Sequence, residues 1–300
     1  MKKLLTLAIM FAATPAFANT PVAKKTTKKT VVAKKVEAKK VEVKKAASPT
    51  TKATKKAPAT EPPLYSIDSA AKPAPPAKTA LARILRAQHL RVCVRSDVPP
   101  FGYFTNKGLT GFDISLATEL AKRISIDYKK NLHIGWTVIT AGARITSLQQ
   151  KTCDIVIAAF SYTKSRAKLV SFSKIYLLTD KVLVAAANLT RKTPVIARVK
   201  GTTGKLDIKG EVRYYNNYQE IINAMEEGTV DYVIADRPIA LHMIRSVTRP
   251  FNITKTLSKN AEHYAVGMNK GDTHLLKAVN SALSSLAQSG RLTYLHRQWL

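Results

Sequence analysis

Cysteine is scarce in this chain: only two of its 300 residues are Cys. Two cysteines exclude both a small fold held together by several disulfides and a zinc site with four cysteine ligands. Acidic residues are also few, since 49 Lys and Arg face 19 Asp and Glu and leave a net charge of +30. Beyond the first twenty residues no apolar run is long enough to span a bilayer. The hydrophobic fraction of 45% nevertheless excludes a wholly disordered protein.

The first residues of the chain have the pattern of an export signal. Lys2 and Lys3 give a positively charged start, Leu4–Ala13 is an apolar run, and residues 16–18 read AFA. Small residues at the first and third of these positions are typical of a signal peptidase site. The apolar run is too short to span a membrane. We therefore expect residues 1–18 to be a signal peptide, cleavage near Ala18, and secretion to a periplasm.

Residues 19–80 form a basic, low-complexity segment. They contain 15 Lys, four acidic residues, no Gly and a single aromatic, Tyr65. Such a segment cannot bury enough apolar surface to offset its ordering entropy, so we expect a disordered tail. Its positive charge fits two interpretations equally well: a solvated spacer, or a tether to anionic, phosphate-rich polymers of the cell envelope.

The rest of the chain alternates predicted strands and helices. Apolar runs predict strands, and apolar residues recurring every three or four positions predict helices, with Asp113 placed to cap the helix that begins after Gly111. The predicted strands are Leu90–Arg95, Ile134–Ile139, Asp154–Phe160, Lys181–Ala186, Val195–Val199 and Asp231–Ala235. The predicted helices are residues 112–124, Ile145–Gln150, Tyr218–Glu227 and Thr273–Ser289. This rhythm, repeated twice, indicates an α/β fold with two parallel units.

The two cysteines lie at or beside strands of the first unit. If those strands end at a common rim, the Cα atoms of Cys93 and Cys153 are roughly 10 Å or more apart. That separation is too large for a disulfide, so we expect two buried free thiols.

Six ordered motifs of the body resemble those of the family 3 extracellular solute-binding proteins, the periplasmic receptors of polar amino-acid importers. They are SDVPPFGY (96–103), GLTGFDISLATELAKRI (108–124), CDIVIAAFSYTKSRAKLVSFS (153–173), KGTTG (200–204), TVDYVIADRPIA (229–240) and SGRLTYLHRQWL (289–300). The resemblance implies the two-lobed type II periplasmic binding protein fold with two crossover hinge strands. By this analogy lobe 1 comprises 88–184 and 265–300, and lobe 2 comprises 185–264.

The resemblance also implies which residues bind the ligand. Arg166 matches the family's arginine for the ligand α-carboxylate, which a guanidinium binds in bidentate fashion, with Ser161 beside it. Thr202 and Thr203 offer backbone N–H groups and hydroxyls to the same anion. Asp236, just past its strand, matches the carboxylate that receives the α-ammonium. Departures from the family pattern, such as Ser115 where a second Asp is usual, fall at positions that support helices and turns.

Two further arginines bear on the ligand side chain. Arg144 in AGARITSL and Arg95 before SDVPPF match basic positions of the aspartate- and glutamate-binding branch. Because unpaired buried cations are costly, we expect an acidic amino acid, glutamate or aspartate. Lys174 would add positive charge near the mouth of the cleft. Phe101 and Tyr103 are candidates for its wall, with the core as the alternative.

Two other function classes remain open. A cyclohexadienyl-dehydratase-like enzyme has the same fold but needs an acid/base with a tuned pKa over the substrate, and none of the six His lies in a cleft motif. The other alternative is an envelope-tethered protein whose basic tail binds polyanions. We expect a monomeric receptor, not an enzyme, that needs no cofactor or metal and delivers its amino acid to an inner-membrane ABC permease.

Overall fold

An eight-stranded sheet runs through the folded part of the chain. In the computed structural model, which describes residues 70–204 and 208–300, the strand order is β5-β1-β6-β11-β7-β10-β8-β9, and β2-β3-β4 form a second, antiparallel sheet. The strands are β1 (His89–Val94), β2 (Asp97–Val98), β3 (Gly102–Thr105), β4 (Gly108–Thr110), β5 (His133–Val138), β6 (Ile155–Val156), β7 (Ser171–Ala186), β8 (Val195–Val199), β9 (Glu211–Tyr215), β10 (Tyr232–Asp236) and β11 (Phe251–Met268).

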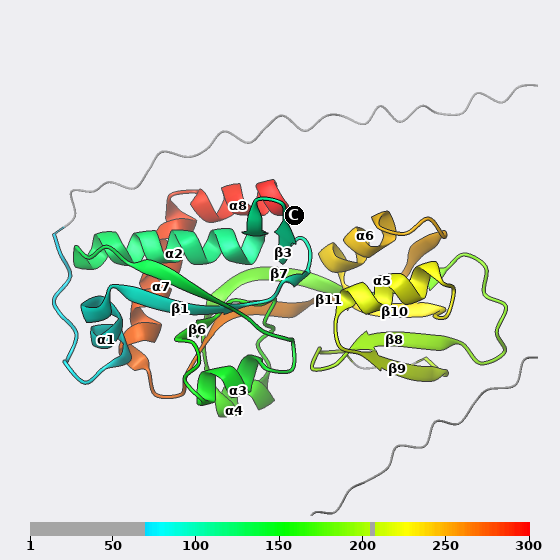
Figure 1. Ribbon diagram of the computed structural model, residues 1–300, viewed down its shortest axis with the longest axis horizontal. Coiled ribbons are helices and arrows are strands. Elements are labelled where there is room, and N and C mark those ends of the chain that lie inside the picture. Colours follow the sequence, from blue (N-terminus) through cyan, green and yellow to red (C-terminus); the bar gives the residue numbers. More distant parts are fainter. Residues whose placement is uncertain (1–69, 205–207) are drawn as a thin grey trace, which may run out of the picture. The chain divides into compact units, whose positions relative to one another are not determined.

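Helices pack on both ends of this sheet (Figure 1). They are α1 (Ala80–Ala87), α2 (Phe112–Tyr128), α3 (Arg144–Gln149), α4 (Lys164–Leu169), α5 (Tyr218–Glu226), α6 (Arg237–Arg245), α7 (Thr273–Gln288) and α8 (Arg291–Trp299). None of the helices within 70–204 and 208–300 has the length and apolar character needed to cross a membrane.

Two parallel groups of strands are joined by a long antiparallel pair. Strand β1 pairs in parallel with β5 and β6, and β8 does so with β9 and β10. We call the first group, with α1–α4, α7 and α8, lobe 1, and the second group, with α5 and α6, lobe 2. Strands β7 and β11 pair with each other and run through both lobes, so the predicted boundaries at 184 and 264 fall inside continuous strands. This is the α/β, two-lobed type II fold that the sequence predicts.

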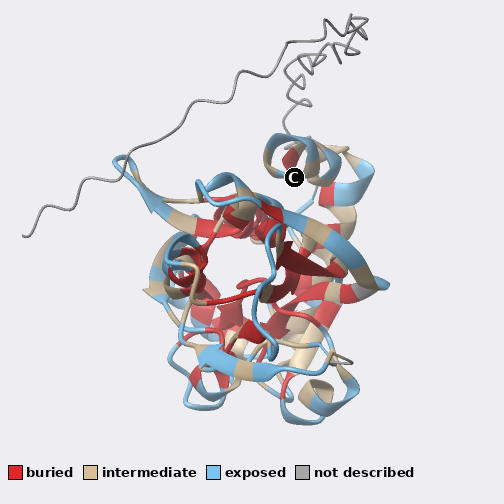
Figure 2. Ribbon diagram, turned by 90° about the vertical axis from the view of Figure 1, so that its right-hand side faces the viewer, coloured by how far each residue is buried: buried red, intermediate tan, exposed pale blue. Residues whose placement is uncertain are grey.

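The core lies between the sheet and the inward faces of the helices. Figure 2 shows the buried residues concentrated on the strands at the centre of the molecule. On α2 the apolar residues recur every four positions, at Phe112, Leu116, Leu120 and Ile124, and all four are fully buried. Asp113 does not cap this helix as predicted. Its carboxylate is buried and accepts hydrogen bonds from the Ala159 N–H (2.7 Å) and the Tyr176 hydroxyl (3.2 Å).

The folded body begins before residue 88. Helix α1 starts at Ala80 and is capped by the side chain of Thr79, which accepts a hydrogen bond from the Ala82 N–H. Upstream, Lys72 belongs to the segment predicted as tail. Its Nζ lies 2.5 Å from Asp127 and donates to Ser281 at 2.6 Å. The last part of that segment is therefore attached to lobe 1. Residues 1–69, which include the predicted signal peptide and most of the tail, lie outside the described residues.

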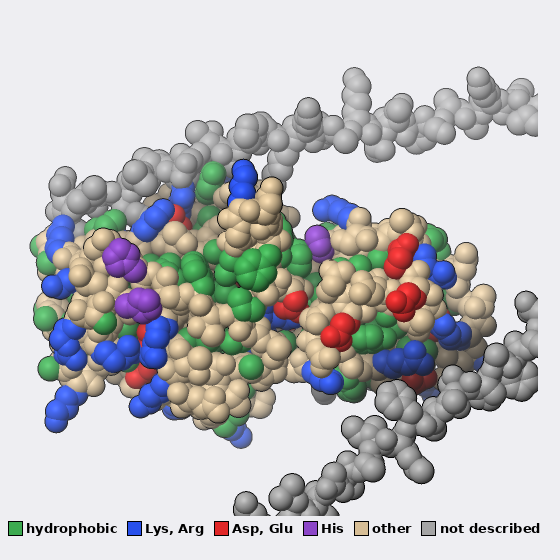
Figure 3. Space-filling view, in the orientation of Figure 1, with side chains coloured by type: hydrophobic (Ala, Val, Ile, Leu, Met, Phe, Trp, Pro, Cys, Tyr) green, Lys and Arg blue, Asp and Glu red, His purple; other side chains and the backbone are tan. Residues whose placement is uncertain are grey.

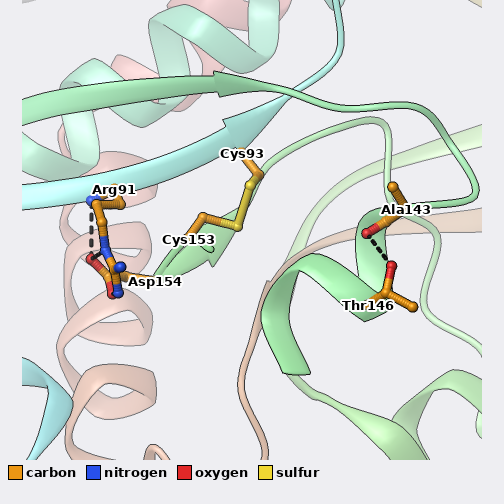
Figure 4. Close-up of a disulfide and its surroundings, with 6 residues drawn as sticks. All are labelled: Arg91, Cys93, Ala143, Thr146, Cys153 and Asp154. Carbon is orange, nitrogen blue, oxygen red and sulfur yellow. Dashed lines mark hydrogen bonds and ion pairs between the residues drawn. A yellow bond between two sulfur atoms is a disulfide. The ribbon is translucent and has the colours of Figure 1, made fainter. Parts of the chain in front are cut away.

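The prediction of two free thiols is wrong. Cys93 and Cys153 form a disulfide, with Cα atoms 5.7 Å apart (Figure 4). The distance argument assumed a regular strand over 154–160. Strand β6 instead has only two residues, and the chain bends at Asp154, so Cys153 approaches β1 directly. The Asp154 carboxylate holds this bend because it accepts hydrogen bonds from the backbone and side chain of Arg91.

Candidate functional site

The residues predicted to bind the ligand gather around one cavity between the lobes. Its space is about 10 Å³ for the centre of a water-sized sphere, which is room for about one water molecule. A ligand of the size of an amino acid does not fit this space as it stands. The lining residues are Arg95, Arg144, Ala159, Ser161, Arg166, Thr202, Thr203, Tyr218, Asp236 and Ile239.

Arg144 opens α3 and points into the protein, with only 3% of its surface exposed. No carboxylate pairs with it among the described residues. All its polar bonds go instead to backbone carbonyls: Nε donates to Ala141 (2.7 Å), Nη1 to Ala158 (3.2 Å) and Ala159 (2.8 Å), and Nη2 to Gly201 (2.9 Å). Burial, followed by the charges of Arg166 and Arg95, lowers the pKa of Arg144 to about 9.

Arg166 approaches the same point from α4. Its Nη1 donates to the Ser161 carbonyl (2.8 Å) and its Nη2 to the Gly201 carbonyl (2.9 Å), and the described residues again supply no carboxylate partner. The ring of Phe160 lies under both guanidinium groups, 4.9 Å from Arg144 and 5.1 Å from Arg166. Two cations therefore face one side of the cavity, and their direct contacts are with backbone carbonyls and an aromatic face, while the charges of Glu262 and Asp236 act on Arg166 from farther away.

Arg95 differs from these two because it already has a carboxylate. Its Nε and Nη2 contact the two oxygens of Asp97 at 2.9 and 2.5 Å, and its guanidinium lies 5.2 Å from the centre of the Tyr218 ring of lobe 2. Asp97 also accepts a hydrogen bond from the Tyr218 N–H (3.3 Å). The pair thus orders the edge of the cavity, and its net charge is zero.

A buried ion cluster adjoins the cavity through Asp236, which lines it. Lys181 of β7, 2% exposed, pairs with Asp236 at the end of β10 and with Glu262 of β11, the latter at 3.3 Å. Burial alone would lower the pKa of Lys181, but the charges of Asp236 and Glu262 outweigh it and raise that pKa. Tyr264 donates its hydroxyl to Asp236. Two carboxylates share one ammonium here, which leaves one negative charge in excess.

Glu262 connects the two lobes through its hydrogen bonds. It accepts from the Ser161 hydroxyl of lobe 1 and, at 2.7 Å, from the Thr203 hydroxyl of lobe 2. Burial would raise the pKa of Glu262, but the charge of Lys181 and these hydroxyl donors lower it, so the group is a carboxylate at neutral pH. Its position on a crossover strand lets it contact both walls of the cavity.

Sequence reasoning missed Lys181 and Glu262. Lys181 opens the buried run 181–185, and Glu262 stands two residues before the buried run 264–268. A charged residue in such a pattern needs a buried partner, and that was the available signal. The partner could not be named because the pairing of β7 with β11 joins residues about 80 positions apart in the sequence.

Three residues considered for the cleft lie elsewhere. Phe101 is fully buried in the core of lobe 1, with its ring centre 5.2 Å from that of Tyr264. Tyr103 packs edge-on against Trp299. Lys174 donates from its Nζ to Ser284 of α7 at 2.8 Å. None of them lines the cavity, so the core alternative describes Phe101 best.

The comparison with protein families assigns the body of the chain. The model of the bacterial extracellular solute-binding proteins, family 3, matches residues 90–300. The chain belongs to this family. Among its relatives is the ABC transporter glutamine-binding protein GlnH of Bacillus subtilis, to which it is 27% identical over 238 residues. This alignment covers 74% of this chain and 85% of GlnH.

Solved structures resemble this family 3 protein in fold as well. An ancestral arginine-binding protein bound to arginine is 26% identical, with a TM-score of 0.65 and coverage of 71% of this chain and 98% of that one. The ancestral amino acid-binding protein AncCDT-1, described as a precursor of cyclohexadienyl dehydratase, is also 26% identical. Its TM-score is 0.63, and the match covers 74% and 99% of the two chains.

Proposed function

We propose that this solute-binding protein is the periplasmic receptor of an ABC importer and that its ligand is an acidic L-amino acid, glutamate or aspartate. The charge arrangement of the cavity supports this proposal. Arg144 and Arg166 form no ion pair with a carboxylate of the described residues, and in the Lys181 cluster two carboxylates share one ammonium, with Arg166 as the next cation. An acidic amino acid carries the complementary set, one ammonium and two carboxylates.

Each ligand group has a partner in this proposal. The α-carboxylate binds Arg166 and the backbone N–H of Thr203, since the Thr202 N–H donates to the Val199 carbonyl (3.3 Å). The α-ammonium binds Asp236, with Ser161 and Glu262 adjacent. The side-chain carboxylate binds Arg144, while Arg95 adds positive potential from its pair with Asp97. A neutral amino acid would leave one cation unmatched, and an arginine ligand would add a like charge to the pair.

Isothermal titration of the secreted protein with glutamate, aspartate, glutamine, arginine and histidine tests the ligand. We expect glutamate or aspartate to bind at least about tenfold more tightly than glutamine, which corresponds to about 1.4 kcal/mol. Tighter binding of arginine or histidine than of either acid would overturn the proposed ligand class, although not the assignment to the family.

The dehydratase alternative has one observation in its favour, the resemblance to AncCDT-1 together with the buried Glu262 beside the cavity. A general acid needs a carboxyl that stays protonated near neutral pH. The lowered pKa of Glu262 argues for a carboxylate that binds rather than an acid that donates a proton. Release of an aromatic product from a cyclohexadienyl carboxylate, followed by absorbance, would reverse this choice.

The tail is proposed to tether the receptor to anionic polymers of the envelope, while a monomeric body binds the ligand. A variant beginning at Ala70 keeps Lys72, Thr79 and α1, and should bind the amino acid as the complete secreted chain does. The complete chain should retain long-chain polyphosphate more strongly than this variant, with a steep dependence on salt. Equal retention of both proteins would leave the tail as a spacer.

A further inference from the structure

A second cavity lies in lobe 1 beside α1, apart from the ligand cavity. Its volume is about 310 Å³, at the lower end of the range of about 300–1,000 Å³ that small-molecule sites occupy. Segments distant in sequence build it: the residues that precede α1, α1 itself, β1, the segment between α3 and β6, and the turn between β11 and α7. No residue is shared between the two cavities.

Basic side chains dominate this second cavity. Five cations line it, Lys78, Arg83, Arg86, Arg91 and Lys151, against two carboxylates, so the formal balance is +3. Figure 3 shows that Lys and Arg side chains also gather on the surface at this end of lobe 1. Such a concentration of one sign of charge raises the local concentration of anions.

The two carboxylates do not neutralise the site. Asp154 forms ion pairs with both Arg83 and Arg91. Burial would raise the pKa of Asp154, but the hydrogen bonds from these arginines outweigh burial and lower it. One carboxylate thus holds two guanidinium groups in place. Asp272 has a raised pKa, first through burial and then through the charge of Asp154. The site therefore keeps an excess of positive charge, which attracts an anionic ligand.

Three of the cations are available to such a ligand. Lys78, Arg86 and Lys151 are exposed and form no ion pair with any described residue. Arg86 donates only to the Ala77 carbonyl, at 2.9 Å. The disulfide holds Cys153, another lining residue, against β1, so the floor of the cavity is fixed covalently beside Arg91 and Asp154 (Figure 4).

We propose that this cavity binds a phosphate-bearing anion. A single carboxylate carries one charge, whereas a phosphomonoester carries close to two and presents oxygens to several donors at once, which suits a cavity with a balance of +3. Arginine matches phosphate oxygens through its planar fork, and lysine adds a point charge. The volume accommodates a group larger than the phosphate itself, such as a glycerol phosphate unit.

The position of the cavity links it to the basic segment that precedes the body. The last four residues of the segment 19–80, which carries 15 Lys and four acidic residues, all line the cavity: Ala77, Lys78, Thr79 and Ala80. A phosphate-rich surface drawn to that segment is brought close to the cavity through chain connectivity. The two then act together, because the second contact benefits from the effective concentration that the first creates.

Titration of the secreted protein with glycerol phosphate, followed by calorimetry at low salt, tests the site. Arg86→Glu combined with Lys151→Glu should weaken binding at least tenfold. The matched control is Lys168→Glu combined with Arg245→Glu, which makes the same charge change at exposed positions of α4 and α6 outside the cavity; it should retain the affinity of the parent. Lys151→Glu alone leaves α1 unchanged and should give an intermediate loss.

Vesicles of equal parts phosphatidic acid, whose headgroup is a phosphomonoester, and phosphatidylcholine identify the source of the phosphate. Weaker vesicle binding by the cavity variant than by the control would assign the site to a lipid headgroup. Equal vesicle binding, with the loss seen only for glycerol phosphate, would assign it to a soluble phosphoester. The proposal is overturned if neither probe distinguishes the cavity variant from its control.

Discussion

Replacement of Arg144 by leucine separates recognition of the ligand side chain from recognition of its α-groups. Leucine keeps an apolar stem over Phe160 but removes the guanidinium, which is buried and has no carboxylate partner among the described residues. In the proposed complex this group faces the side-chain carboxylate of glutamate. Arg166 and Asp236, which face the α-groups, are left in place.

The expected losses follow from the type of bond removed. Loss of a buried, hydrogen-bonded charge pair costs about 2–5 kcal/mol, which at about 1.36 kcal/mol per factor of ten is a loss of about 30- to 5,000-fold for glutamate. The amide of glutamine accepts one hydrogen bond from the same guanidinium, worth about 1.5 kcal/mol or roughly tenfold. The variant should therefore lose most of its preference for glutamate over glutamine.

Calorimetric titration of both ligands into both proteins measures this difference directly. Urea unfolding of the ligand-free proteins is the necessary control, because the substitution also removes four hydrogen bonds to backbone carbonyls. If Arg144 only braces those carbonyls, the variant will be less stable but will lose the same affinity for glutamate as for glutamine. That result would refute the role of Arg144 in selecting the ligand.

Three further perturbations test other parts of the structure. Arg166→Ala and Asp236→Ala should each weaken binding of any amino acid by at least about 2–3 kcal/mol, since each strands a ligand charge in a closed site; unchanged calorimetric affinity in both would remove them from the site. The double substitution Cys93→Ser and Cys153→Ser should lower the free energy of unfolding, measured from urea unfolding curves, by about 2–4 kcal/mol. An unchanged urea midpoint would mean that the disulfide contributes little to the stability of the folded state. Burial is the main cause that raises the pKa of Asp113 to about 7, so the folded state holds an extra proton between the unfolded pKa and about 7. The free energy of unfolding should therefore fall as pH rises through that interval, and Asp113→Asn should flatten this fall. A free energy of unfolding of the wild type that is already constant from pH 4 to 8 would contradict the assignment.

The positions of the proposed site residues came from the resemblance to the family, and they fit a general rule because each lies at or after the end of a strand. Ser161 and Arg166 come after the apolar run that includes β6, Thr202 and Thr203 after β8, and Asp236 ends β10. Strand ends of α/β proteins converge on one edge of the sheet, and the resemblance to the family supplied the order of the motifs. These facts were enough to bring seven residues to one cavity without any knowledge of distances.

The contacts that needed long-range register could not be anticipated. The disulfide depends on the bend at Asp154 and on the shortness of β6, neither of which has a clear signal in an apolar run of seven residues. The partners of Lys181 depend on the irregular register between β7 and β11. Asp113 appeared to be a helix cap because capping is local, whereas its actual partners, Ala159 and Tyr176, lie 46 and 63 residues away.

The chain path makes lobe 2 an insertion within lobe 1. Lobe 1 contains both α1, the first described helix, and α8, the last one. The elements from β8 to α6 are connected to lobe 1 through β7 and β11. Mechanical tension applied through the N-terminal segment is therefore borne by lobe 1 and does not load the two crossover strands. If the N-terminal segment anchors the protein as proposed, lobe 2 stays free to move about the two crossover strands.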